Sequence, residues 1–267
     1  MMDMITKRER DSMSSANNKL FKLRKKALGT EEPSCAAVIL AAGSSVRMGS
    51  DKILAKLEEL PVLARTLRPF QESPCISEIV VVTSAEKLME VTELCREYNI
   101  GKVSKVVTGG KTRAESALTG VSEVSSRAEL IAIHDGARPL VTQELIARTV
   151  QMAAKKLAAV PAIRSTDTLK TAGEDGAIVG TVDRERTWRI QTPQVFKADL
   201  IKGALTKAMK QELPLTDDSS AIELLGMTCF IVEGDEENIK LTRPLDFLLA
   251  AAILKDRRNR DADRTGL

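Results

Sequence analysis

The sequence contains 267 residues, of which 43% are hydrophobic and 29% are charged, a balance typical of one globular domain and not of a repeat array or a fibre. The formal net charge is +3, but the positive excess lies near the two ends, in residues 1–33 and 255–267. The stretch between them is slightly acidic, so we expect no nucleic-acid partner, because such a partner requires a basic surface on the folded body.

We expect residues 1–33 to form a flexible N-terminal extension, because they are polar and mixed in charge. They lack the apolar core of a secretory signal, and no apolar run in the sequence approaches the roughly 20 residues that span a bilayer. Four cysteines, Cys35, Cys75, Cys95 and Cys229, are widely separated, which argues against a zinc site or a disulfide framework. We therefore expect a cytoplasmic protein without a membrane contact.

Residues 34–254 alternate short apolar runs with longer amphipathic segments. The predicted strands, most of them continuous and β-branched, are 35–42, 78–84, 104–108, 129–135, 157–163 and 228–234, and the predicted helices are 86–100, 113–125, 142–157 and 217–226. This order predicts an α/β fold with a doubly wound, mainly parallel sheet covered by helices on both faces. Such sheets bind ligands beyond the carboxyl ends of their strands. Residues 255–267 offer little to bury, and we expect them to form a charged C-terminal tail outside the domain.

The first predicted strand ends in small residues, Ala41-Ala42-Gly43-Ser44-Ser45, and two cations follow, Arg47 and Lys52. Small residues let the backbone approach a ligand closely, and free amide groups beside two cations suit an oligophosphate. The spacing matches neither G-x-x-x-x-G-K-[ST] nor G-x-G-x-x-G, which excludes an ATPase P-loop and an ordinary dinucleotide-binding loop. A structural turn followed by two solvated cations remains an alternative interpretation.

A later predicted strand ends in His134-Asp135-Gly136-Ala137-Arg138. A carboxylate at the end of a buried strand is a natural ligand for a hard cation that bridges phosphates, and an arginine can bind a phosphate in bidentate fashion. The alternative is an Asp-Gly turn beside a surface arginine. His134 is the only histidine, so it cannot form a two-histidine metal site, and we interpret it as structural.

Seven blocks occur in a fixed order: AAVILAAGSSVRMGSDK, GGKTRAESA, HDGARP, STDTLK, TVDRERTWRIQTPQVF, LTDDSSAIE and VEGDEENIKLTRPLD. In this order and spacing they resemble the 2-C-methyl-D-erythritol 4-phosphate cytidylyltransferase family of isoprenoid precursor synthesis, over residues 36–254. The resemblance implies a Rossmann-like nucleotidyltransferase that transfers CMP from CTP to the sugar-alcohol phosphate and releases pyrophosphate. A phosphate nucleophile is already deprotonated at pH 7, so cations and Mg²⁺ are needed more than a general base.

The resemblance also implies a role for individual residues. Arg47 and Lys52 match the catalytic cations that hold the CTP phosphates, and Asp135 matches the carboxylate close to Mg²⁺. Nucleotide binding is implied for Ala41, Ala42, Gly43, Gly109, Gly110 and Ser116, and binding of the polyol phosphate for Arg138, Thr192, Thr216 and Lys240. Residues 161–184 match a β-arm that crosses to a second subunit, where Thr168 and Arg184 would serve the neighbouring site. The implied working unit is a homodimer.

Two departures from the family pattern leave base selection open. The connection from Arg47 to Lys52 is shorter than usual, and Lys111 stands where an acidic residue often follows the glycine pair. Three alternatives therefore remain beside the leading hypothesis: a ribitol 5-phosphate cytidylyltransferase, a molybdopterin-type guanylyltransferase, which the shortened loop also resembles, and a nucleotide-binding protein without turnover.

Overall fold

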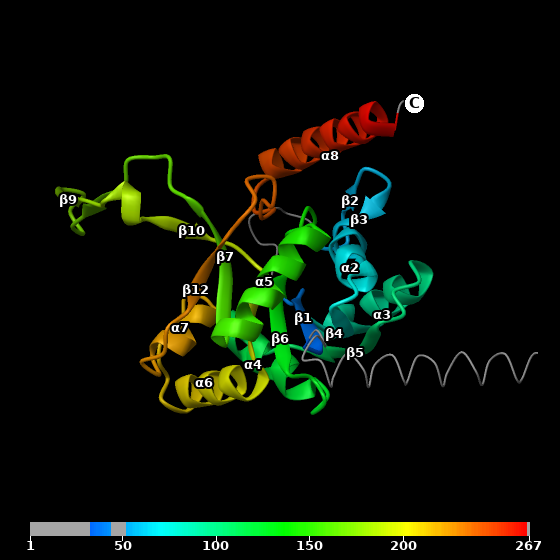
Figure 1. The fold of residues 1–267 in the computed structure, drawn as a ribbon, viewed down its shortest axis with the longest axis horizontal. Helices are drawn as coiled ribbons and strands as arrows, with labels where there is room; N and C mark the ends of the chain where they lie inside the picture. Colours follow the sequence, from blue (N-terminus) through cyan, green and yellow to red (C-terminus); the bar gives the residue numbers. More distant parts are fainter. Residues whose placement is uncertain (1–32, 44–51, 266–267) are drawn as a thin grey trace, which may run out of the picture. The chain divides into compact units, whose positions relative to one another are not determined.

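The computed structural model describes residues 33–43 and 52–265. Its centre is an eight-stranded sheet with the order β10-β7-β11-β6-β1-β4-β5, in which β12 also pairs with β7 (Figure 1). The strands are β1 (Cys35–Leu40), β4 (Ile76–Thr83), β5 (Val103–Thr108), β6 (Leu130–Asp135), β7 (Ala158–Arg164), β10 (Trp188–Ile190), β11 (Gln194–Lys197) and β12 (Phe230–Glu233).

The sheet is mixed but mainly parallel. Strand β1 pairs parallel with β4 and β6, β4 with β5, and β12 with β7. Strands β10 and β11 are the antiparallel members. The prediction of an α/β fold with a mainly parallel sheet is therefore confirmed. Strand β11, which lies between β6 and β7 in the sheet, was not indicated by the sequence.

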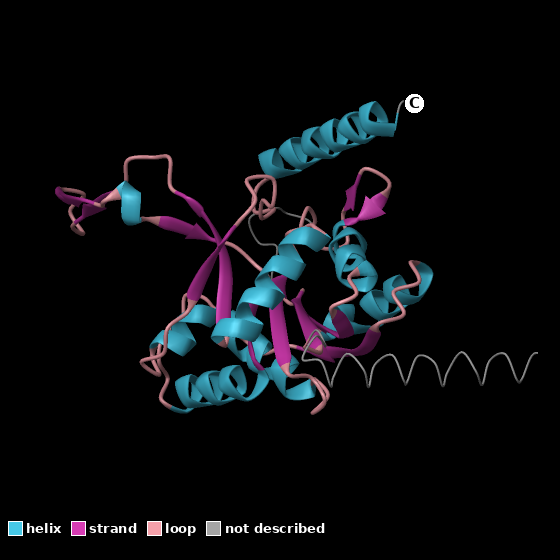
Figure 2. Ribbon diagram, in the orientation of Figure 1, coloured by secondary structure: helices cyan, strands magenta, loops and turns pink. Residues whose placement is uncertain are grey.

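Helices cover both faces of the sheet (Figure 2). They are α2 (Val62–Glu72), α3 (Leu88–Glu97), α4 (Arg113–Glu123), α5 (Gln143–Lys156), α6 (Ala198–Lys210), α7 (Asp218–Glu223) and α8 (Pro244–Thr265). Along β1, Ala37 and Ile39 join the core beneath α2, α3 and α5, whereas Val38 joins the core beneath α4, α6 and α7. Because successive strand side chains point to opposite faces, burial on both faces explains why β1 is apolar at every position.

Side-chain caps set the start of three helices near the carboxyl edge of the sheet. Thr112 accepts a hydrogen bond from the Glu115 amide at the start of α4, and Thr142 accepts one from the Leu145 amide at the start of α5. Asp217 forms a capping box at the start of α7. Each cap satisfies an amide group that the first helical turn leaves without a partner, so these three helices begin at defined positions.

A slender arm projects from the sheet between β7 and β10 (Figure 1). It consists of the hairpin of β8 (Lys170–Ala172) and β9 (Ile178–Thr181), followed by the short helix η2 (Arg184–Arg186). Two large apolar side chains near its tip, Ile178 and Val179, are 68% and 74% exposed. The sequence predicted an arm over residues 161–184, but residues 161–164 belong to β7 of the central sheet, so the projecting part begins after Arg164.

The C-terminal segment differs from the expected tail, because α8 continues through it to Thr265. The first half of α8 packs Ala250 on Leu57 and Leu140. Its second half is charged, and arginines anchor it to the body through ion pairs. Within residues 33–43 and 52–265, no helix is long and apolar enough to cross a membrane.

Candidate active site

Four strands of the sheet bring the predicted site segments to one edge. Just past β1, the Ala41 amide donates to the Val82 carbonyl of β4 at 2.7 Å. Just past β6, the Gly136 amide donates to the Leu40 carbonyl at the end of β1, at 2.8 Å. The Gly109 amide, just past β5, donates to the carbonyl of Thr83 at 2.8 Å. The carboxyl ends of β1, β4, β5 and β6 are thus tied together by backbone hydrogen bonds.

The predicted nucleotide-binding residues lie in direct contact at this edge. A Cβ atom added to Gly109 would come within 2.6 Å of the Ser116 hydroxyl and within 3.0 Å of the Ala42 Cβ. Ser116 is buried, and its hydroxyl donates to the Thr112 carbonyl at 2.9 Å. Only glycine leaves room between these two segments. Gly43 and Gly110 are exposed beside them.

Asp135 is the centre of a cluster of cations. Its carboxylate lies 3.3 Å from Arg113 Nε, 3.5 Å from Arg138 Nε and 3.0 Å from Lys240 Nζ. Burial by itself would raise the pKa of Asp135, but the charges of Arg113, Lys240 and Arg138 outweigh it and hold the pKa well below its usual range. The carboxylate is therefore ionised at every physiological pH.

Arg113 connects Asp135 to a second buried carboxylate. While Nε faces Asp135, the two terminal nitrogens donate to both oxygens of Asp218 at 2.9 and 2.8 Å. The Asp218 side chain is 1% exposed. Burial alone would lower the pKa of Arg113, and the ion pairs with Asp218 and Asp135 raise it above its usual value instead. The bidentate pair holds α4 and α7 together across the site.

Neither Arg113 nor Asp218 was predicted as a site residue. The sequence does contain a signal for Arg113, since it occupies the first position of α4, where a cation is unfavourable next to the positive end of the helix dipole. Such a placement indicates an anionic partner. Nothing in the sequence identifies which of the carboxylates supplies it.

Thr192 and His134 fix the backbone of Asp135 through a chain of hydrogen bonds. The Asp135 amide donates to the Thr192 hydroxyl at 3.1 Å, so the hydroxyl proton is directed to His134 Nδ1, 2.9 Å away. His134 Nε2 lies 3.2 Å from the Arg138 carbonyl, so these partners assign the imidazole proton to Nε2. Burial lowers the pKa of His134 to about 4, and the ring is neutral at pH 7.

The loop after β12 completes the cluster. Arg138 donates to the Asn238 carbonyl at 2.7 Å and to the Ile190 carbonyl at 3.5 Å. Asn238 is fully buried, and its amide nitrogen donates to the Thr192 carbonyl at 2.9 Å. Lys240 follows two residues later with a side chain that is 39% exposed. Its ammonium group therefore combines a contact to Asp135 with access from solvent.

The other predicted site residues are distributed as follows. Arg47 lies outside the described residues. Lys52 is half-buried in a turn that precedes the short hairpin of β2 (Lys56–Leu57) and β3 (Leu60–Pro61). The Leu63 amide of α2 donates to the Ile53 carbonyl in this turn at 2.9 Å. Thr216 is exposed and directly precedes the α7 cap. Thr168 and Arg184 are exposed on the projecting arm and not in the Asp135 cluster.

The donor set around Asp135 limits how a metal ion can be held. Across residues 33–43 and 52–265, no group of three or more His, Cys, Asp or Glu side chains is arranged to hold a metal. Mg²⁺ often binds through one or two carboxylates together with substrate phosphates. Asp135 fits a metal that is shared with a nucleotide, and it does not fit a cage made by the protein alone.

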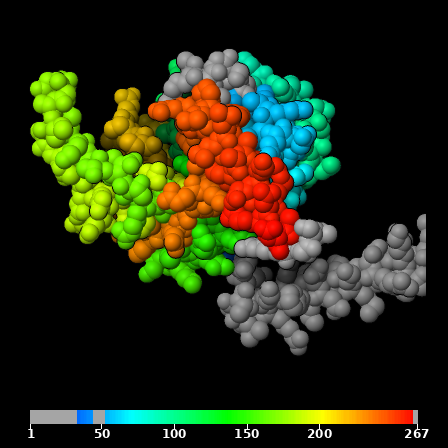
Figure 3. Space-filling view, turned by 90° about the horizontal axis from the view of Figure 1, so that it is seen from above, coloured from blue at the N-terminus to red at the C-terminus, as the bar shows by residue number. Residues whose placement is uncertain are grey.

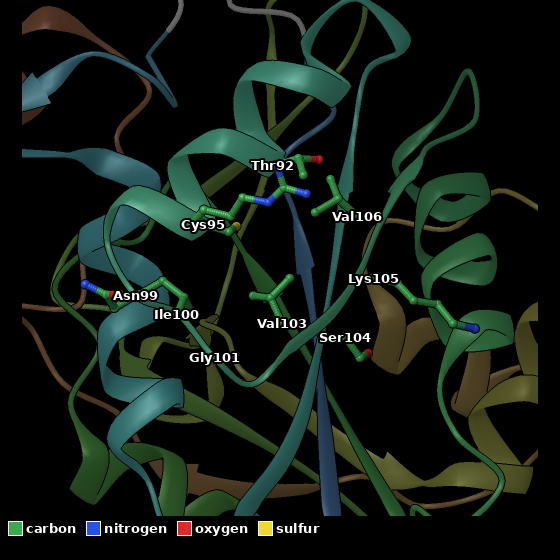
Figure 4. Close-up of a pocket in the computed structure, with 10 residues that line it drawn as sticks. Thr92, Cys95, Asn99, Ile100, Gly101, Val103, Ser104, Lys105 and Val106 are labelled. Atoms are coloured by element: carbon green, nitrogen blue, oxygen red, sulfur yellow. The ribbon is translucent and has the colours of Figure 1, made fainter.

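A separate hollow lies along the edge strand of the sheet, between α3 and β5 (Figure 4). Its lining includes Cys95, Arg96, Ile100, Val103 and Lys105. It contains none of the residues predicted for the site. Since β5 is the last strand of the sheet, this hollow belongs to the sheet edge and not to the carboxyl ends of the strands.

Comparison with known proteins gives one consistent result. The family model described as "IspD: 2-C-methyl-D-erythritol 4-phosphate cytidylyltransferase" matches residues 35–256. The chain is 42% identical to the protein of that name from Caldanaerobacter subterraneus, covering 82% of this chain and 98% of the relative. It is 41% identical to the one from Halalkalibacterium halodurans, covering 84% and 98%.

A solved structure agrees with these relatives. The crystal structure of 4-diphosphocytidyl-2C-methyl-D-erythritol synthase from Anaerococcus prevotii superimposes with a TM-score of 0.75 at 29% identity. The alignment covers 84% of this chain and all of that structure.

Proposed function

This chain belongs to the 2-C-methyl-D-erythritol 4-phosphate cytidylyltransferase family, and from that premise we propose how its residues carry out the reaction. The chain is an enzyme that transfers CMP from CTP to 2-C-methyl-D-erythritol 4-phosphate in the non-mevalonate route to isoprenoid precursors. The observation that carries our assignment of roles is the cluster in which Arg113, Arg138 and Lys240 surround Asp135.

Two anions must meet in this reaction, since an oxygen of the acceptor phosphate attacks the α-phosphorus of CTP and pyrophosphate leaves. Catalysis of such transfers depends on positioning and on fixed positive charge, because the nucleophile needs no activation by a base. The cluster has three cations for the two carboxylates Asp135 and Asp218. This excess of positive charge supports its role as the meeting point of the substrates.

We assign the nucleotide to the carboxyl edge of the sheet, at the two segments that follow β1 and β5. Ala41, Ala42 and Gly43 lie against the segment of Gly109, Gly110 and Ser116, and the small residues there allow the base and ribose to approach the backbone. Arg47 and Lys52 hold the phosphates and stabilise the charge that develops at the α-phosphorus. Their places in the sequence, a few residues after the small residues that follow β1, are the support for this role.

We assign the acceptor phosphate to the opposite side of Asp135. Lys240 supplies the accessible cation, and Thr216 lies at the exposed entrance to α7. Arg138 and Thr192 act mainly through the bonds that fix Asn238 and the Asp135 backbone. These contacts support a role in shaping the acceptor site.

Asp135 is the residue that would hold Mg²⁺, together with the CTP phosphates. When it is bound, the ion would neutralise part of the phosphate charge. The low pKa of Asp135 keeps the carboxylate ionised, as a metal ligand must be. We also propose that the working unit is a homodimer in which the arm brings Thr168 and Arg184 to the neighbouring site. The exposed apolar residues near the arm tip support this assembly.

The test is release of pyrophosphate from the purified enzyme with Mg²⁺. We expect release with CTP and 2-C-methyl-D-erythritol 4-phosphate, and little with GTP or with ribitol 5-phosphate. Preferential use of ribitol 5-phosphate or of GTP would overturn the assignment of acceptor or base. Absence of release with every pair would favour a nucleotide-binding protein without turnover.

A further inference from the structure

The second half of α8 extends beyond the residues that the family model matches, which end at 256, yet it is firmly attached to the body. Arg257, the next residue, places Nε 2.6 Å from a Glu237 carboxylate oxygen and donates from a terminal nitrogen to the Leu140 carbonyl at 3.0 Å. A third contact, at 3.7 Å, reaches Asp235. The Arg257 side chain is only 23% exposed.

Arg260 completes the hold on Glu237. One turn further along α8, its guanidinium lies 2.6 Å from the other Glu237 oxygen. Burial by itself would raise the pKa of Glu237, but the hydrogen bonds from Arg257 and Arg260 outweigh it and keep the pKa below its usual value. Glu237 is therefore an anion whose two oxygens are both fixed by α8. Figure 3 shows α8 lying along the surface beside the segment that precedes it.

The loop that contains Glu237 leads directly into the active site. Residues 234–240 contain no helix or strand. Asn238, the next residue after Glu237, bonds Thr192 and Arg138 from inside, and Lys240 contacts Asp135. The loop is thus held by site residues on its inner side and by α8 on its outer side.

We propose that Arg257 is a positioning residue for the reaction: by holding Glu237 and Asp235 from outside, it fixes the loop 234–240 that presents Lys240 to the acceptor phosphate. This inference rests on the acceptor-binding role proposed above for Lys240. Arg260 assists it by fixing the second Glu237 oxygen. A preorganised cation lowers the entropy lost on binding. Since Lys240 is assigned to the acceptor, we expect loss of Arg257 to weaken binding of the acceptor and not of CTP.

Steady-state kinetics of the full-length enzyme test the proposal. We expect Arg257→Ala to raise KM for the acceptor about three- to ten-fold, in line with the net contribution of one ordinary hydrogen bond, with KM for CTP nearly unchanged. Arg257→Lys keeps the charge that faces Glu237, so its effect on KM for the acceptor should be smaller than that of Arg257→Ala. An effect should remain, because a lysine cannot reach Glu237 and Leu140 together. Lys255→Ala, an exposed position on the same helix, is the matched control and should leave both KM values unchanged.

A double-mutant cycle with Lys240 separates positioning from general destabilisation. In the Lys240→Ala background, Arg257→Ala should add little to KM for the acceptor, because the cation that it positions is already missing. Equal effects of Arg257→Ala in both backgrounds would overturn the proposal, as would an unchanged acceptor KM in Arg257→Ala. If Lys240→Ala alone leaves the acceptor KM unchanged, the assigned role of Lys240 fails instead.

Amide hydrogen exchange gives a readout that does not depend on turnover. If Arg257 fixes the loop, Arg257→Ala should speed exchange of the amides of residues 235–239 more than that of amides in the β6 strand. Exchange that rises equally throughout the protein would indicate loss of global stability and would count against positioning.

Discussion

At the scale of single residues, Arg113 has the most demanding position. One guanidinium bonds two carboxylates from different parts of the chain, Asp135 at the end of β6 and Asp218 in α7. A planar fork with five donors can do this, whereas a lysine ammonium provides a single point of contact. Arg113 therefore sets the distance between the carboxylate assigned to the metal and the helix behind the acceptor site.

Replacement of Arg113 by lysine should be costly although the charge is kept. We expect Arg113→Lys to lower kcat/KM about ten-fold or more and to lower the free energy of unfolding by about 1–3 kcal/mol, because at least one buried carboxylate oxygen loses its partner. Enzyme assays and chemical denaturation measure the two effects.

Arg127→Lys is the matched control, since Arg127 is exposed in the loop after α4. It should change neither quantity measurably. Wild-type kcat/KM in Arg113→Lys would show that the bidentate geometry is not required.

At the scale of secondary-structure elements, long apolar runs were predictable and short paired strands were not. The six predicted strands match β1, β4, β5, β6, β7 and β12. In β1, β4, β6 and β7, burial on both faces explains the continuous apolar run. β11 has only four residues, and it is a strand because β6 and β7 pair with its two edges. That pairing is a long-range contact that the local sequence does not indicate.

Helices α2 and α6 were also missed, although each buries residues at helical spacing, such as Leu63, Leu67 and Phe70 in α2. The second half of α8 was assigned to a tail because it has few apolar residues. Ion pairs of Arg257 and Arg258 with Glu237 and Glu58 stabilise it instead. Their partners lie far away in sequence, so composition alone suggests a solvated segment.

The candidate site shows the same division. Ala42 and Asp135 could be predicted as site candidates because a parallel sheet gathers its carboxyl ends at one edge, whereas Gly109 was indicated only by the resemblance to the family. The pair of Arg113 and Asp218 joins positions 105 residues apart. No local pattern encodes that contact, so only the folded chain identifies it.

The close approach of the segments after β1 and β5 gives an element-scale prediction. Gly109→Ala would place a methyl group 2.6 Å from the Ser116 hydroxyl and 3.0 Å from the Ala42 Cβ, so the Ser116 side chain must move and the segment after β1 is crowded. We expect KM for CTP to rise about ten-fold, with a smaller change in KM for the acceptor.

Gly203→Ala in α6 serves as the control, because a Cβ there meets nothing within 4 Å and alanine favours a helix. It should leave the kinetics unchanged and raise the melting temperature slightly. A larger rise in the acceptor KM than in the CTP KM for Gly109→Ala would contradict our assignment of this edge to the nucleotide.

At the scale of the whole molecule, the arm gives the physical reason to expect assembly. A projecting hairpin with Ile178 and Val179 exposed leaves apolar surface in water that a second copy of the chain can cover. Arg184, one of the basic residues of the arm, lies outside the Asp135 cluster, so it can serve an acceptor only if a partner brings a site to it. Lys240, in contrast, contacts Asp135 within its own chain.

This difference predicts complementation between two defective variants. We expect Lys240→Ala and Arg184→Ala each to raise KM for the acceptor strongly when assayed alone. In a mixed dimer, the chain with an intact Lys240 receives the partner subunit's Arg184 from the chain that kept it, and one site of the two is complete. Random exchange of subunits makes about half of the dimers mixed, so about a quarter of wild-type activity should return at low acceptor concentration.

Mixing Lys240→Ala with Arg113→Lys is the matched control, because both residues belong to the same site and no mixed dimer contains a complete one. Activity in this control should stay at the average of the two variants. Recovery with Arg184→Ala and not with Arg113→Lys is expected only if the arm crosses between subunits. The same low activity in both mixtures, after subunit exchange has been verified by mass spectrometry, would mean that Arg184 acts within its own chain. An unchanged acceptor KM in Arg184→Ala alone would mean that Arg184 has no role in the site.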